Sequence, residues 1–123
     1  MANAPFDVVG VGNAIVDVIA QSDENDLARL DLNKGTMTLI DDAQADWLYS
    51  EMNAGVETSG GSAANTLAGI ASLGGKGAYI GKVREDQLGA VFSQDLKAIG
   101  VDYPMRAATE GPSTARCLIF VTP

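Results

Sequence analysis

The sequence predicts an α/β fold, and three observations lead to this prediction. Short β-branched runs alternate along the chain with segments whose apolar residues recur at helical spacing. Fourteen glycines in 123 residues indicate many places where the backbone turns sharply or comes close to a ligand, as in α/β folds with binding loops. Hydrophobic residues make up 46% of the chain, a globular composition. This length suits one small domain or part of a larger one.

The first half of the chain is expected to combine strands with helices. Apolar, β-branched runs predict strands at residues 6–11, 14–20 and 36–40. Early acidic residues and two leucines at helical spacing predict a brief helix over 23–30, followed by a turn at 33–35. Asp41 and Gln44 stand at capping-box spacing, so a helix is expected from about residue 42 to 53.

The second half contains the helix with the clearest amphipathic pattern. Asp86 is expected to cap this helix, and Gly100 ends it. Its apolar face is formed by Leu88, Val91, Phe92, Leu96 and Ile99. A small-residue loop over 59–64 is expected to lead into an earlier helix over 65–73. The remaining strands are predicted at 78–83, 103–107 and 114–121, the last two joined by a turn at 110–112.

The charged and reactive side chains limit the chemistry that the chain can perform. There are 16 acidic and 8 basic residues, and the net charge of −8 argues against nucleic acid or an anionic membrane surface as partner. Without histidine and with one cysteine, the chain has no His general base, no Ser-His-Asp triad and no His/Cys zinc site. Carboxylates, hydroxyls, amides and backbone N–H groups remain.

The expected location is the cytoplasm. Cys117 is the single cysteine and forms no internal disulfide, which suits a reducing compartment. Residues 1–7 lack the cationic start and apolar stretch of a signal peptide, and no run approaches the ~20 apolar residues of a membrane span. No exported or membrane-inserted form is therefore expected.

Two nucleotide-binding motifs are incomplete in the sequence. Gly10 and Gly12 follow a predicted strand, but Ile15 stands at the third glycine position of the dinucleotide fingerprint, and the next run is typical of a strand. A nicotinamide-dependent oxidoreductase would need a helix directly after Gly12. Lys82 follows a glycine but precedes Val83, so the Walker phosphate loop is not matched either.

The segment from Ser59 to Asn65 (SGGSAAN) has two interpretations. Paired glycines before a helix leave the free N–H groups of its first turn open to an oxygen-rich ligand. Asn65, one turn into the helix, offers an amide donor and an acceptor, which suits an alcohol. The alternative is an ordinary glycine-rich helix start with a capping side chain.

Asp17 stands inside an apolar strand pattern. With a period of two, Asn13, Ile15 and Asp17 share one face, which combines an amide, an apolar contact and a carboxylate. An ionised Asp can accept hydrogen bonds from two adjacent sugar hydroxyls. The alternative is simple alternation, in which Asp17 faces solvent while Val16 and Val18 face inward.

Three stretches together resemble a known family. They are Gly12 to Asp17 (GNAIVD), Gly60 to Asn65 (GGSAAN), and the later positions Gly74, Gly81 and Asp86 to Gly89. In this order and spacing they resemble the PfkB (ribokinase-like) family of carbohydrate and nucleoside kinases. The first stretch and the lead-in Val56 to Thr58 look most like the adenosine-kinase branch.

The resemblance implies a ribokinase-like α/β fold: a central, mostly parallel sheet flanked by helices, with a small β lid. The chain 1–123 would be the N-terminal portion of one such domain. Its lid segments would be about 14–40 and 103–123, and its α/β core about 6–12 and 56–102. The apolar run Cys117 to Val121 would need a covering layer, and most of the intended core is expected from residues outside this sequence.

The resemblance also implies an acceptor-binding site. Asp17 would bind hydroxyls, with Asn13 and Ile15 beside it. The polar wall would be completed by Gly60, Gly61, Ser62 and Asn65. Met37 and Cys117 are candidate apolar lid contacts.

The family's second motif, Gly-Ala-Gly-Asp with the catalytic base, does not occur in these residues, so no catalytic residue and no metal ligand is assigned here. The complete protein is expected to phosphorylate a hydroxymethyl group on a sugar or nucleoside with ATP and Mg²⁺, whose sites would lie mostly outside this chain. The isolated segment is expected to be inactive. The alternative is a non-catalytic binding or assembly module whose exposed sheet pairs with itself or a partner, and a homodimer through the lid strands belongs to the same set of hypotheses.

Overall fold

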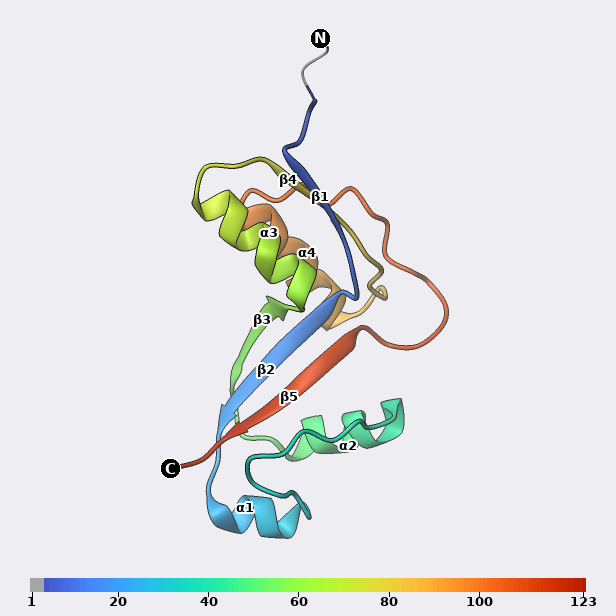
Figure 1. The fold of residues 1–123 in the computed structure, drawn as a ribbon. Helices are drawn as coiled ribbons and strands as arrows, with labels where there is room; N and C mark the ends of the chain where they lie inside the picture. Colours follow the sequence, from blue (N-terminus) through green and yellow to red (C-terminus); the bar gives the residue numbers. More distant parts are fainter. Residues whose placement is uncertain (1–3) are drawn as a thin grey trace.

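The computed structural model describes residues 4–123 as two small sheets with four helices (Figure 1). The strands are β1 (Val8–Val11), β2 (Ile15–Gln21), β3 (Val56–Gly60), β4 (Gly77–Ile80) and β5 (Ala115–Val121). The helices are α1 (Glu24–Arg29), α2 (Asp42–Glu51), α3 (Ser62–Ser72) and α4 (Gln87–Ala98). The predicted α/β class is confirmed. Every helix in the described part is too short or too polar to cross a lipid bilayer.

The two-stranded sheet pairs β1 with β4 in parallel, and α3 packs on it. Leu67 of α3 is 1% exposed and lies directly against the sheet. A Cβ built on Gly10 or on Gly77 would stand 2.9 Å from a methyl carbon of Leu67. The two glycines therefore let the helix approach the backbone of both strands closely.

The three-stranded sheet has β2 at its centre, antiparallel to β3 and parallel to β5. Successive side chains of β2 point to opposite faces of the sheet, and one face is buried: Val16, Val18 and Ala20 lie on it. Helices α2 and α4 contact the sheet, as Figure 1 shows for α4 beside β3. The opposite face, with Ile15 and Asp17, is only half-buried.

Two predicted strands do not form. Residues 36–40 lie outside every strand, and the Leu39 side chain is 89% exposed. A β-branched run gains little as a strand unless a neighbour completes its backbone hydrogen bonds. Residues 103–107 are likewise not a strand: single bridges at Asp102 and Ala108 flank them, and Pro104 has no N–H to donate.

Residues 56–60 also differ from the expectation. They were expected as the start of the α/β core with a loop from residue 59, but they form β3, which pairs antiparallel with β2. Helix α3 then begins at Ser62 rather than at residue 65. The cause is long-range: the backbone groups of Ser59 and Gly60 find partners on β2, which no local pattern shows.

Three helices begin directly after an aspartate that caps them. The Asp23 carboxylate accepts from the Asp26 amide in a complete capping box, and Asp41 accepts from the Gln44 amide at 2.8 Å. Asp86 caps α4 by accepting from the Gly89 amide, also at 2.8 Å. Each carboxylate satisfies an N–H of the first turn that has no partner within the helix.

Replacing Gly69 by alanine is expected to stabilise the protein. Gly69 lies inside α3, and a Cβ built there has no atom within 4 Å apart from its immediate surroundings in the helix. Alanine lowers the backbone entropy of the unfolded chain, and the free energy of unfolding should rise by about 0.5–1 kcal/mol. Urea unfolding measures this change, and an equal or lower midpoint would show that the position is not a free helix surface.

Candidate functional site

Asp17 lies in the middle of β2, on the half-buried face of the three-stranded sheet. It stands opposite Thr58 of β3 and Cys117 of β5 in the register of the strands. Burial raises the pKa of its carboxyl group above the ordinary value of 3.8. Burial is the cause of this shift. Among residues 4–123, no hydrogen-bond donor lowers the pKa of the carboxyl group again by stabilising its charge.

The paired glycines lie against the Asp17 strand. Gly60 is buried, and a Cβ built on it would stand 2.6 Å from Cγ and 2.7 Å from Oδ1 of Asp17. Only glycine leaves room for the carboxylate above this stretch of backbone. The strand and the glycine segment, which lie far apart in the sequence, therefore meet at one place.

Gly61 joins the same cluster from the start of α3. Its φ of +88° lies in the region that favours glycine, and a Cβ there would stand 2.9 Å from the carbonyl oxygen of Asn13. The same Cβ would be 3.8 Å from Cβ of Ile15. The structure thus brings together Asn13, Ile15, Asp17, Gly60 and Gly61.

The first turn of α3 opens beside this cluster. Gly61 is the N-cap residue and has no side chain to satisfy the helix amides, and Ser62 is exposed. Asn65 donates its backbone N–H to the Gly61 carbonyl at 2.9 Å, and its side chain is exposed. A helix start with uncapped N–H groups favours oxygen-bearing ligands.

The two candidate apolar contacts differ in position. Cys117 is exposed on β5 next to Asp17, and burial together with the Asp17 charge raises the pKa of its thiol. Met37 lies in the segment that forms no strand and is 80% exposed. Of the two, Cys117 is the one that shares a strand register with the carboxylate.

Sequence reasoning missed one neighbour of Asp17. Thr58 stands opposite it on β3 and adds a hydroxyl to the same strand register. The strand over 56–60 places Thr58 and Gly60 on one face, but it forms only by pairing with β2, so no local signal in the sequence identified this neighbour.

The dinucleotide interpretation is excluded by the chain's course after Gly12. A strand, β2, begins at Ile15, where the fingerprint requires the start of a helix. Gly12 instead allows the chain to pack closely against α3, because a Cβ built on it would stand 2.9 Å from the methyl group of Ala63.

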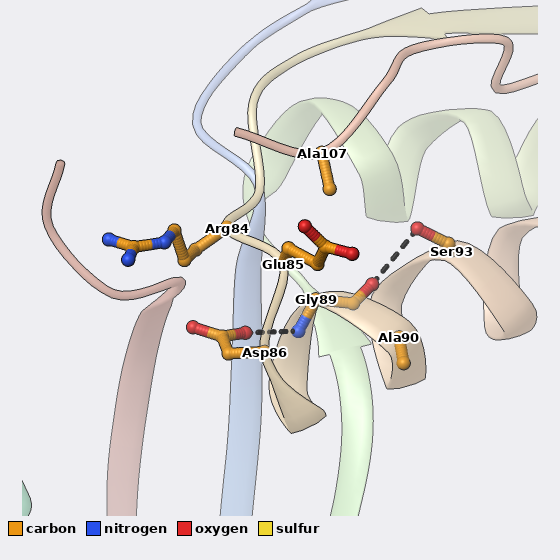
Figure 2. A pocket seen from close by; sticks show the side chains of 7 residues that line it. All are labelled: Arg84, Glu85, Asp86, Gly89, Ala90, Ser93 and Ala107. Atoms are coloured by element: carbon orange, nitrogen blue, oxygen red, sulfur yellow. Dashed lines mark hydrogen bonds between the residues drawn. The ribbon is translucent and has the colours of Figure 1, made fainter. Parts of the chain in front are cut away.

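A separate hollow of about 350 Å³ lies at the start of α4 (Figure 2). Figure 2 shows it bordered by Glu85, Ser93 and Ala107, with the bond between Asp86 and the Gly89 amide beside it. None of the predicted site residues lines this hollow. The candidate site is instead the surface around the half-buried Asp17.

Comparison with known proteins identifies relatives of this chain. A family model described as pfkB family carbohydrate kinase matches residues 6–123. An adenosine kinase from Sinorhizobium meliloti is similar in structure, with a TM-score of 0.82 and 51% identity over 97% of this chain. A probable sugar kinase from Rhizobium etli CFN 42 gives a TM-score of 0.81 and 50% identity over 95% of the chain. Fructokinase from Escherichia coli is 33% identical over 66% of it.

These relatives are longer than the present chain. The chain covers 36% of each of the two bacterial structures and 26% of the Escherichia coli fructokinase. The family model's match over residues 6–123 includes both sheets and the cluster around Asp17.

Proposed function

Because this chain belongs to the pfkB family of carbohydrate kinases, we propose that it supplies the acceptor-binding part of a kinase that phosphorylates a hydroxymethyl group on a sugar or nucleoside. The observation that carries the proposal is the Asp17 carboxylate, partly desolvated and without a donor among residues 4–123, lying over the backbone of Gly60. The complete kinase consists of this chain together with the part of the enzyme that binds ATP.

The chemistry of binding depends on the side chains in the cluster. The ionised Asp17 carboxylate accepts hydrogen bonds from two neighbouring hydroxyls of the acceptor. The glycine pair allows the sugar ring to approach the backbone, and Asn13, Ser62 and Asn65 supply further polar groups. An analogue without one hydroxyl leaves the carboxylate desolvated and unpaired, which gives specificity for a diol.

A nucleoside is the proposed acceptor class. The Sinorhizobium meliloti relative at 51% identity is an adenosine kinase, and the relative from Escherichia coli, at 33%, is a fructokinase. Ile15, Ile19 and Cys117 border Asp17 on the same sheet face and offer apolar surface to a base. A small sugar would leave much of this surface uncovered.

ATP and Mg²⁺ are the proposed co-substrate and metal. Bound Mg²⁺ would bridge and neutralise the phosphate oxygens during transfer. The role of this chain is to hold the acceptor in place while the groups that activate its hydroxyl come from elsewhere, since the Gly-Ala-Gly-Asp motif is not in the sequence. The 123-residue chain by itself is accordingly proposed to have no kinase activity, and the complete enzyme to be cytoplasmic.

A thermal-shift panel on the complete kinase tests the acceptor class. Adenosine, inosine, guanosine, ribose and fructose are compared at 100 times the Kd of the tightest binder, which stabilises by about 2.7 kcal/mol. For a kinase as long as these relatives, that raises the Tm by roughly 3–5 °C. We expect the largest shift with adenosine. A Tm that none of the five compounds changes would contradict a sugar or nucleoside acceptor.

The pH dependence of the complete kinase tests the state of Asp17. Its raised pKa means that the carboxylate becomes protonated at a higher pH than an ordinary aspartate, and the protonated group loses an acceptor site. kcat/KM for the acceptor should therefore fall as the pH decreases through this raised value. This fall at low pH should disappear in the Asp17→Asn variant. If the variant shows the same fall, a group other than Asp17 causes it.

A non-catalytic assembly role is the second candidate. Val56 is 64% exposed on the face that carries Asp17, and Ile119 and Val121 of β5 are only half-buried. A second copy pairing through this sheet would cover these side chains. Sedimentation distinguishes the two proposals: a mass that rises with concentration and does not respond to adenosine or fructose supports assembly.

A further inference from the structure

Thr114 is a buried polar residue at the entry to the three-stranded sheet. It directly precedes β5. Its side chain is 2% exposed, and it is the one buried polar residue among residues 4–123. Its hydroxyl accepts from the Arg84 amide at 2.9 Å and donates to Oδ1 of Asp86 at 2.7 Å. A buried hydroxyl with both functions satisfied fixes the local geometry more tightly than an exposed one.

Asp86 uses both of its carboxylate oxygens in this arrangement. Oδ1 accepts from the Gly89 amide, which caps α4, and from the Thr114 hydroxyl. Oδ2 accepts from the Thr114 amide at 2.9 Å. Burial alone would raise the pKa of Asp86, but the hydrogen bonds from Thr114 and Gly89 outweigh it, and the pKa lies below its ordinary value. The folded protein thus favours the charged acceptor.

The bond to Thr114 is more than a helix cap. At α2 the equivalent carboxylate, Asp41, is exposed, and among residues 4–123 it accepts only from the amide of Gln44 within the same turn. Asp86 instead joins the start of α4 to a strand 28 residues further along the chain. The segment that leads from the α/β part to β5 is otherwise exposed, from Thr109 to Pro112.

The position of β5 bears directly on Asp17. β5 pairs with β2 over seven residue pairs, from Ile15 with Ala115 to Gln21 with Val121, and Cys117 lies opposite Asp17. Helix α4 holds the other edge of the sheet as well, because Asp95 accepts from the Ser59 amide at 2.7 Å, next to Gly60. The strand with Asp17 is therefore held between two strands that α4 anchors.

We propose that Asp86, acting through Thr114, is a positioning residue for the acceptor site: it fixes where β5 begins and thereby holds Asp17 over Gly60. This inference rests on the proposed function and deepens it. It assigns Asp86 no contact with the acceptor.

The test uses Asp86→Asn in the complete kinase. Asparagine caps a helix as well as aspartate does, so the Gly89 bond can remain. Its amide group, however, replaces Oδ2 with a donor that faces the Thr114 amide. This removes one of the two hydrogen bonds to Thr114, and it removes the negative charge that strengthens the bond from the Thr114 hydroxyl to Oδ1. Asp41→Asn is the matched control, since it makes the same change at a helix cap without a partner in β5.

Steady-state kinetics with adenosine and with fructose, at varied ATP, give the first readout. Asp86→Asn should raise the KM for the acceptor at least about 10-fold, because charge-assisted hydrogen bonds are lost, and leave the KM for ATP unchanged. Thr114→Val removes the bond from the hydroxyl and should also raise the acceptor KM, whereas Thr114→Ser should retain wild-type values. The double variant Asp86→Asn with Thr114→Val loses both bonds and should raise the acceptor KM more than either single variant.

Hydrogen exchange of the complete kinase gives the second readout. Asp86→Asn should speed exchange of the amides from Ala115 to Leu118, and Asp41→Asn should not. An unchanged acceptor KM in Asp86→Asn, or equal rises in the KM for the acceptor and for ATP, would overturn the positioning role. Asp17→Ala measured alongside separates this result from a failure of the proposed function, since a wild-type acceptor KM in Asp17→Ala would reject the acceptor site itself.

Discussion

Replacing Asp17 by alanine in the complete kinase is expected to lower kcat/KM for the acceptor at least about 100-fold, mainly by raising KM. The variant removes the acceptor of two hydroxyl hydrogen bonds from a partly desolvated site in which no described group takes over this role. Asp17 contributes little to the fold, because burial of its charge is uncompensated and Val16 and Val18 supply the buried face of the strand. The loss should therefore appear in kinetics and not in the Tm.

Glu110→Ala is the control for Asp17→Ala. It removes one negative charge from an exposed loop of the same chain and leaves β2 intact. Wild-type kinetics in Glu110→Ala show that the change in net charge alone has no effect. A kcat/KM for adenosine and for fructose that stays within about twofold of wild type in Asp17→Ala would remove the basis for an acceptor site here.

Replacing Gly60 by alanine is the second change with a large expected effect. The new methyl group would stand 2.6 Å from Cγ of Asp17, well inside contact distance, so the carboxylate must move. Gly60 has an ordinary backbone conformation, unlike Gly61, so the methyl group and not backbone strain causes the loss. We expect kcat/KM for the acceptor to fall roughly 10- to 100-fold in steady-state assays.

Gly69→Ala is the matched control for Gly60→Ala. Both add one methyl group to a glycine of the same chain, but a Cβ at Gly69 meets open space. Gly69→Ala should retain full activity with a slightly higher Tm. If both variants kept wild-type kinetics, Asp17 and Gly60 would not form one binding surface in the working enzyme.

Elements defined by local patterns were predictable from the sequence. The alternation over residues 14–20 indicated β2 and placed Asp17 on the face opposite Val16 and Val18. The spacing from Leu88 to Ile99 and the cap at Asp86 indicated α4, because both signals lie within the helix itself. The cluster around Asp17 was predicted by resemblance, and the structure shows the two segments in contact.

Features that depend on a distant partner were not predictable. A loop was expected from residue 59, because serine and glycine favour turns, and only pairing with β2 makes a strand of residues 56–60. The same reasoning explains residues 36–40, whose apolar run has a strand composition but pairs with no strand in the described part of the chain. Asp86 was recognised as a helix cap, but its second partner, Thr114, lies 28 residues away and leaves no local signal.

The acceptor site is tested most directly by a crystal structure of the complete kinase with adenosine, or with fructose if fructose is the acceptor that binds. Two adjacent hydroxyls of the acceptor are predicted to lie within hydrogen-bond distance of the Asp17 carboxylate, with the sugar ring over Gly60 and Gly61. An ordered acceptor bound elsewhere, with Asp17 facing solvent, would contradict this prediction.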